Sequence, residues 1–172
     1  SYMMASNAYT EGTVSSAVVN CGTDYDYIIT SNTGYHIDYV VLDGDRTNYT
    51  GQQANDVITV TDVQSDHQLD VYFAINHYDI VATAEGHGTI VPAGTTDVEH
   101  FSSLTYTITP EEPCYHIADV LVDGASVGAV NTYTFADIDG PHTIHAIFEI
   151  NRYAVAESHT GNGTVTSDTV NC

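Results

Sequence analysis

Lysine and tryptophan are absent from this 172-residue sequence, and arginine occurs only as Arg46 and Arg152. Aspartate and glutamate together number 23, so the formal net charge is −21. A chain with two permanent cations cannot form the clustered basic surface that nucleic acids and anionic lipids require. We therefore expect no nucleic-acid partner, and the absence of lysine also excludes Lys–Asn isopeptide cross-links.

Long apolar runs are lacking as well. No hydrophobic stretch approaches the length of about 18 residues at which a transmembrane helix becomes a candidate, and no signal peptide opens the sequence. We expect a soluble segment that does not insert into a membrane. The hydrophobic share of 42 %, with 10 % aromatic residues, is nevertheless typical of a folded protein, so the charge does not indicate disorder.

An internal repeat is the strongest positive signal in the sequence. YMMASNAYTEGTVSSAVVNC at residues 2–21 aligns without a gap with YAVAESHTGNGTVTSDTVNC at residues 153–172. A third copy of the same beginning, YDIVATAEGHGTIVPAG, occupies residues 78–94. The repeated unit is therefore about 75 residues long.

Later landmarks follow the same repeat. GYHIDYVVLDG at residues 34–44 matches CYHIADVLVDG at residues 114–124, and LDVYFAIN matches IHAIFEIN near the end of each unit. We predict a first β-repeat over residues 1–76 and a second over residues 77–151. Residues 152–172 are then the first hairpin of a third repeat, which is incomplete or pairs with a neighbouring unit.

Apolar and polar residues alternate with a period of two, which predicts β-strands. Tyr25, Tyr27 and Ile29 illustrate the alternation, and glycine, proline and Asx clusters mark the turns between strands. No sustained helical stripe is present. We predict an all-β fold with almost no helix, built from small β-sandwiches of Greek-key or immunoglobulin-like type, or from β-grasp-like units, arranged end to end. The strands are expected at residues 2–7, 12–19, 24–30, 35–42, 56–62 and 67–75, and again at 78–84, 88–91, 102–109, 115–122, 131–136 and 142–150.

The three cysteines are too widely spaced for zinc, redox or haem motifs. Cys21 and Cys172 end the two aligned segments, whereas Cys114 stands where the first repeat has Gly34. If the repeats follow one another regularly, Cys114 bonds to Cys172 while Cys21 bonds to a preceding unit. A Cys21–Cys114 bond and free thiols are the alternatives.

The segments GYHIDYVVLDG and CYHIADVLVDGASVGAVNTYTFADIDGPHTIHAIF resemble the divergent internalin-B-type B-repeat of bacterial cell-wall and secreted proteins. The resemblance extends over residues 78–150 and is looser in the first repeat. It implies an extracellular or cell-surface location, tandem arrays that act as spacers or adhesive modules, and no catalytic residues. That family typically has glycine where Cys114 stands, which implies a cross-link specific to this protein.

Four aspartates in glycine-containing turns are weak candidates for Ca²⁺ binding: Asp43, Asp45, Asp137 and Asp139. Their segments resemble fragments of calcium loops, but neither continues to the glutamate that an EF-hand requires, and turn formation is the favoured explanation, with weak Ca²⁺ binding at repeat junctions as the alternative. No other cofactor or metal is predicted.

Two further patterns accompany the repeat. His36 and His116 share one repeat position and His67 and His142 share another, without the spacing of a metal motif. Asn48 and Asn162 begin Asn-X-Thr glycosylation patterns in predicted turns.

The functional expectation follows from the framework. No nucleophile with a base and no carboxylate pair stands outside the repeated positions, so we expect no enzyme. The first hypothesis is a structural repeat module of an extracellular bacterial surface protein or filament that associates end to end with identical or neighbouring units. The alternative is an adhesin module that binds a glycan or a host or cell-surface protein. An adhesin predicts an exposed aromatic cluster, whereas a filament predicts a strand complemented by a neighbour.

Overall fold

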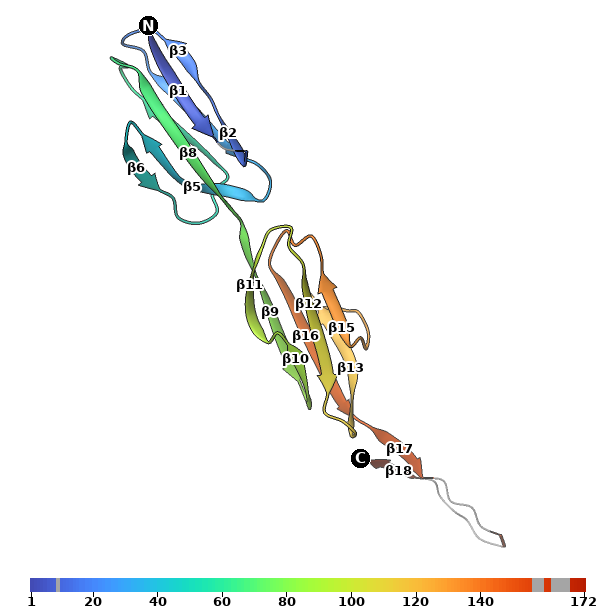
Figure 1. Cartoon of the computed structure of the whole chain (residues 1–172). Coiled ribbons are helices and arrows are strands. Elements are labelled where there is room, and N and C mark those ends of the chain that lie inside the picture. Colours follow the sequence, from blue (N-terminus) through green and yellow to red (C-terminus); the bar gives the residue numbers. More distant parts are fainter. Residues whose placement is uncertain (9, 156–159, 162–167) are drawn as a thin grey trace. The chain divides into compact units, whose positions relative to one another are not determined.

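The computed structural model describes residues 1–8, 10–155, 160–161 and 168–172 (Figure 1). The predicted all-β class is confirmed, because every regular element of the described residues is a strand. No helix capable of crossing a membrane occurs in this part of the chain. The chain divides into two compact units, Ser1–His77 and Tyr78–Cys172.

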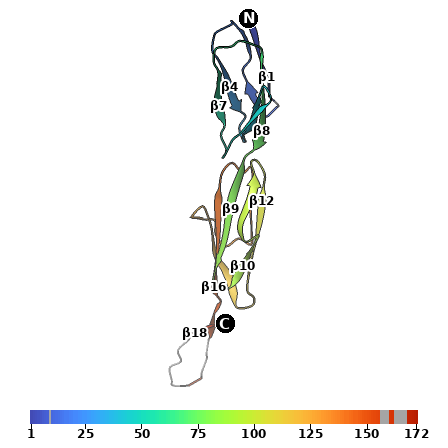
Figure 2. The ribbon, with the colours of Figure 1, turned by 90° about the vertical axis from the view of Figure 1, so that its left-hand side faces the viewer.

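The first unit consists of two sheets. The larger sheet has the order β3-β1-β8-β5-β6, and the smaller has the order β2-β4-β7. Figure 2 views this unit from the side, with β4 and β7 in one layer and β1 and β8 in the other. The strands are β1 (Tyr2–Ala8), β2 (Gly12–Val14), β3 (Ala17–Val19), β4 (Tyr25–Ser31), β5 (Tyr35–Leu42), β6 (Asp45–Asn48), β7 (Asn55–Val60) and β8 (His67–Ile75).

The first and last strands of this unit are neighbours that run parallel. Met4 lies opposite His67, and Asn7 lies opposite Asp70. The partner on the other side of β8 is β5, which runs antiparallel to it. Because β1 and β8 begin at the same end of the sheet, the chain enters the unit at one end and leaves it at the opposite end.

The second unit has the same strand order. Its sheets, β11-β9-β16-β13-β14 and β10-β12-β15, correspond strand for strand to those of the first unit, and β9 pairs parallel with β16 as β1 does with β8. The strands are β9 (His77–Glu85), β10 (Gly88–Val91), β11 (Gly94–Glu99), β12 (Leu104–Pro110), β13 (Tyr115–Val122), β14 (Ala125–Ser126), β15 (Thr132–Phe135) and β16 (His142–Ile150).

A two-stranded sheet follows the second unit's sandwich. It pairs β17 (Arg152–Val155) with β18 (Asp168–Asn171). Tyr153 lies opposite Val170 in this hairpin, as Tyr2 lies opposite Val19 in the β1–β3 pair. The register of β17–β18 is therefore the register of β1–β3, displaced by 151 positions.

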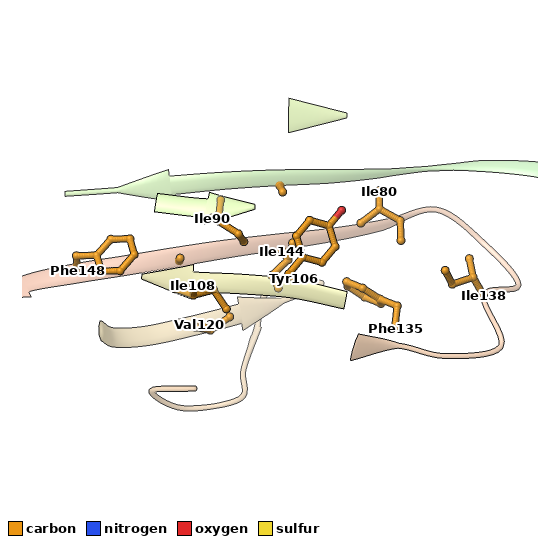
Figure 3. Packing of buried hydrophobic residues seen from close by; sticks show 11 residues of the cluster. Ile80, Ile90, Tyr106, Ile108, Val120, Phe135, Ile138, Ile144 and Phe148 are labelled. Carbon is orange, nitrogen blue, oxygen red and sulfur yellow. The ribbon is translucent and has the colours of Figure 1, made fainter. Parts of the chain in front are cut away.

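Each unit buries its own apolar core between its two sheets. In the first unit, Tyr27 and Ile29 of β4 pack with residues of the larger sheet such as Ile37 and Leu69, all fully buried. Figure 3 shows the second core, in which Tyr106 and Ile108 of β12 lie against Ile144 of β16. The period-two alternation of the sequence explains both cores, since every second side chain of a strand points inward.

A phenylalanine of the last strand packs against a glycine of the second strand in both units. A Cβ added to Gly12 would lie 2.3 Å from Cζ of Phe73, and a Cβ added to Gly88 would lie 2.5 Å from Cζ of Phe148. Any larger residue would collide with the ring. This contact explains why glycine is the first residue of the repeated Gly-Thr-Val and Gly-Thr-Ile segments.

The structure differs from the expected strands in two respects. The predicted strand 12–19 is divided at Ser15 and Ser16 into β2 and β3, which belong to different sheets. Three short strands were not predicted, namely β6, β11 and β14.

The predicted boundary between repeats after residue 76 lies one residue before the end of the first compact unit, and residues 152–172 are part of the second unit.

Candidate functional site

The cysteines form one covalent link in the structure. Cys114 and Cys172 are joined by a disulfide with a Cα–Cα distance of 5.1 Å, within the range of about 4.4–6.8 Å in which such bonds form. Cys114 lies directly before β13 and Cys172 directly after β18. The bond therefore ties the hairpin β17–β18 to the sandwich of the second unit, and it joins the pair favoured by the sequence.

Asn151, the single residue between β16 and β17, holds this junction together. Its backbone N–H donates to the Cys114 carbonyl at 2.7 Å, and its own carbonyl accepts from the Cys172 N–H at 3.1 Å. Its side-chain Nδ2 donates to the Pro113 carbonyl at 2.7 Å, and its Oδ1 lies 2.9 Å from Nδ1 of His116. Because Oδ1 can only accept, Nδ1 of His116 carries the proton.

The first unit repeats part of this arrangement without a cysteine. The N–H of Asn76 donates to the Gly34 carbonyl at 2.8 Å, and Oδ1 of Asn76 lies 2.9 Å from Nδ1 of His36. Gly34 has a φ of 84°, a backbone conformation that strains any residue with a side chain. The shared histidine position found in the sequence thus has a structural role in both units, as the partner of an asparagine at the end of the last strand.

A surface hollow of about 520 Å³ lies next to the cross-link. It is lined by His116, Glu149, Ile150, Asn151, Arg152 and Tyr153. Asn151 and His116 of this lining are engaged with one another. The interactions that the structure shows at this junction are the disulfide and the hydrogen bonds of Asn151.

Cys21 is a free, exposed cysteine. Its Sγ lies 3.4 Å from Oε1 of Gln64, and it occupies a turn in which the Thr23 N–H and hydroxyl bond to the Asn20 carbonyl. Ser102 makes the same two bonds to the Glu99 carbonyl in the second unit. By this match His100 stands where the first unit has Cys21, so the second unit has no cysteine at that position.

An aspartate–histidine pair recurs at the turn between the fifth and sixth strands of each unit. Nδ1 of His67 lies 2.5 Å from Oδ2 of Asp43, and Nδ1 of His142 lies 2.7 Å from Oδ2 of Asp123. The other oxygen of each carboxyl accepts a backbone N–H, from Gln68 in the first unit and from Thr143 in the second. Each pair therefore fastens a turn to the beginning of the last strand.

The electrostatics of the two pairs are also alike. Burial raises the pKa of the Asp43 carboxyl, but the hydrogen bonds from Gln68 and His67 and the nearby imidazole outweigh burial and hold the pKa below its usual value. The pKa of Asp123 is lowered in the same way, by Thr143 and His142 against the effect of burial. The sequence signal for these pairs was present, since Asp-Gly and the histidine recur at matching repeat positions.

The calcium candidates do not converge. Asp43 is engaged with His67 and Gln68, whereas Asp45, Asp137 and Asp139 are exposed. Within the described ranges, no three side chains of the metal-ligating types His, Cys, Asp and Glu gather at one point. This geometry offers no argument for a cation site. Asn48, a glycosylation candidate, is exposed in β6 and accepts a hydrogen bond from Arg46, and Asn162 lies outside the described residues.

Tyrosines gather on the outer face of the larger sheet in the first unit. Tyr39 and Tyr72 stack with ring centroids 4.2 Å apart, and the Arg46 guanidinium lies 3.5 Å from the Tyr39 ring centroid. Both faces of Tyr39 are thus covered. The matching pair in the second unit is Asp119 and Ile147, which are also opposite each other in the sheet.

The smaller sheet of the second unit presents a face of threonines. Six exposed threonines alternate along its strands with inward-facing residues such as Tyr106 and Ile108, and Oγ1 of Thr105 lies 2.8 Å from Oγ1 of Thr134. All residues of β10, β12 and β15 are described, and none is charged. The corresponding sheet of the first unit contains Asp26 and Asp56. The six residues are Thr89, Thr105, Thr107, Thr109, Thr132 and Thr134.

No protein-family model, curated protein or solved structure matches the chain.

Proposed function

We propose that this chain is a structural repeat module of an extracellular bacterial surface protein or filament, without catalytic activity, in which successive units are joined end to end. The observation that carries the proposal is the β17–β18 hairpin, which has the register of β1–β3 and is bonded through Cys172 to Cys114 of the second unit's sandwich. A third unit that begins in this way would be covalently fastened to the second.

Three features support this proposal. The two units have the same strand order, and only Asn76 and Asn151 separate the last strand of each unit from the next strand. A disulfide is typical of oxidising, extracellular compartments. The net charge of −21 keeps such a surface soluble. The resemblance to internalin-B-type B-repeats belongs to the same proposal.

The experiment is negative-stain electron microscopy of the chain over a range of concentrations, with a non-reducing gel of the same samples. We expect oligomers or filaments joined end to end, which become more abundant as the protein concentration rises. Dispersed monomers at every concentration, from micromolar to millimolar, would contradict self-association.

A second candidate function is favoured by the threonine face. We propose it as an adhesin surface for a neutral glycan, because hydroxyl groups on an uncharged, flat sheet can hydrogen-bond to sugar hydroxyls without burying a charge. The surrounding acidic surface would reject anionic ligands. Thr107 lies at the centre of this face, opposite Val91 on one side and Thr132 on the other.

A glycan array with the full chain tests this second candidate. Binding to neutral glycans should be lost in Thr107→Asp and kept in Thr30→Asp, a matched change in β4, the central strand of the corresponding sheet of the first unit. Absence of binding, or equal loss in both variants, would leave only the structural function.

A further inference from the structure

Cys21 and Cys172 occupy the same place in the same structural element. Cys172 follows β18, whose residue Val170 lies opposite Tyr153, and Cys21 follows β3, whose residue Val19 lies opposite Tyr2. Both cysteines end an Asn-Cys pair, and both are exposed. The environment of Cys172 therefore indicates what Cys21 binds, and Cys172 is bonded to Cys114.

We propose that Cys21 is a head-to-tail cross-linking residue, which bonds to Cys114 of a second copy of this chain in the place that Cys172 holds in the first copy. The inference rests on the proposed structural function and names its partner and the joining atoms, Sγ of Cys21 and Sγ of Cys114.

The position of each cysteine within its own unit favours a second copy over an intrachain bond. Cys21 lies at the end of the first unit where β1 begins, whereas Asn76, at the end of β8, lies at the opposite end. Cys114 is bound to Asn151 at the far end of the second unit from the beginning of β9. Each cysteine is thus at the end of its unit that is away from the link between the two units.

Each copy has a single cysteine, Cys114, with which either Cys21 or Cys172 can form this disulfide. Gly34 is the first unit's counterpart of Cys114, and its φ of 84° disfavours a side chain there. Cys21 and Cys172 therefore compete for Cys114. The hairpin that carries Cys172 leaves Tyr153, Val155 and Val170 exposed, whereas the corresponding Tyr2, Met4 and Val19 pack against the core of the first unit. The first unit therefore carries Cys21, the counterpart of Cys172, on a hairpin that is packed into a complete sandwich.

The chemistry is thiol–disulfide exchange and needs no external oxidant. The thiolate of Cys21 attacks Sγ of Cys114, a Cys21–Cys114 bond forms, the Cys114–Cys172 bond breaks, and Cys172 leaves as a thiolate that takes up the proton lost by Cys21. One disulfide and one thiol are present before and after. Because Cys172 is tethered to Cys114, its effective concentration is of millimolar order, so exchange in the wild type requires a high protein concentration.

The sharpest test removes the competitor. The full-length variant Cys172→Ser has free thiols at Cys21 and Cys114, and oxidised glutathione supplies the oxidation by accepting two electrons and two protons from the pair. We expect a ladder of covalent oligomers on a non-reducing gel at micromolar protein, and mass spectrometry of the excised bands should find the peptide pair joined through Cys21 and Cys114. Wild type should show the same linkage only at concentrations near millimolar, because the Cys21 thiol must then compete with the tethered Cys172.

The double variant Cys21→Ser/Cys172→Ser is the matched control and should remain monomeric. Three results overturn the inference: dimers joined only through Cys21–Cys21, an intrachain Cys21–Cys114 monomer, or a Cys21 thiol that stays unreacted. We expect every variant to fold, because the exposed hairpin contributes little to the core, and circular dichroism checks this. If Cys21→Ser still forms end-to-end filaments under the microscope, the inference fails and the structural function stands.

Discussion

Asp123 and His142 contact each other at 2.7 Å between Oδ2 and Nδ1, and Asp43 and His67 make the same contact at the matching positions of the first unit. In each pair the residues come from a turn and from the first residue of the last strand. Two distant parts of each unit are thereby fastened through one carboxyl group.

Stability should fall in acid in a way that depends on these pairs. The folded-state pKa values of Asp43 and Asp123 lie below the unfolded value of 3.8. Their contribution is therefore fully present above pH 3.8 and is lost as the pH falls through the lower folded-state pKa. The difference in melting temperature between wild type and Asp43→Asn/Asp123→Asn should be constant at neutral pH and shrink between about pH 4 and pH 2.

The size of this effect is limited by exposure. The side chains of Asp43 and Asp123 are 42 % and 48 % exposed, so each site should contribute no more than about 0.5–1 kcal/mol. Asp45→Asn/Asp139→Asn, at exposed aspartates of β6 and of the loop before β16, serves as the control and should show no such pH-dependent difference. If the difference in melting temperature between wild type and Asp43→Asn/Asp123→Asn grew in acid, the stabilising role of the two ionised carboxyl groups would be contradicted.

Gly88→Ala should destabilise the second unit because the added methyl group meets the Phe148 ring at 2.5 Å. Overpacking of this kind costs about 1–3 kcal/mol. Thermal or urea unfolding followed by circular dichroism measures the loss, and Phe148→Leu in the same chain should restore part of it. Gly140→Ala is the control, since nothing lies within 4 Å of its added Cβ. Equal stability of the two alanine variants would show that the close glycine–ring contact is not tight in solution.

Tyr27→Phe should destabilise the first unit without altering its shape. The hydroxyl of Tyr27 lies 3.0 Å from the Ala5 carbonyl and 3.2 Å from the His67 carbonyl, so it bridges β1 and β8 from beneath. Its burial raises the pKa to about 12. Without the hydroxyl, the Ala5 and His67 carbonyls lose a hydrogen-bond donor, so the free energy of unfolding should fall by about 1 kcal/mol. Denaturant unfolding measures this change. Tyr153→Phe, on an exposed residue, should change nothing.

Asn151→Ala should expose the Cys114–Cys172 bond to reductant. The variant loses the side-chain bonds to Pro113 and His116, which order the junction. We expect faster reduction by dithiothreitol and faster amide exchange at Tyr153 and Val170, whereas β9 and β16 stay protected. Asn76→Ala removes the corresponding residue of the first unit and should leave the reduction rate unchanged. Equal rates in all three proteins would mean that Asn151 does not shield the bond.

Most of the strands could be predicted because their inward residues alternate without interruption. Tyr25, Tyr27 and Ile29 in β4 are a clear case, and their predicted strand 24–30 differs from β4 by one residue at each end. Strands β6 and β14 escaped prediction because they are short, polar edge strands whose residues are exposed, so no buried face marks them in the sequence.

Pairing was harder to predict than strand position. The alternation of residues 12–19 is interrupted at Ser15 and Ser16, where the inward-facing position changes from the even-numbered Val14 to the odd-numbered Val19. Two adjacent serines do not by themselves reveal that the chain changes sheets there. The parallel pairing of β1 with β8 joins residues more than sixty positions apart, and only tertiary packing determines it. The Asn151 junction was missed for another reason, since asparagine at a strand end ordinarily indicates no more than a turn.

The parallel arrangement of β1 and β8 has a mechanical consequence. Tension applied through the ends of a unit acts on Tyr2 at one end and on Ile75 at the other, along the strand direction and across the hydrogen bonds that join the two strands. All of these bonds are then loaded together in shear and cannot open one after another. A unit with this topology should therefore resist unfolding by a force applied along its length.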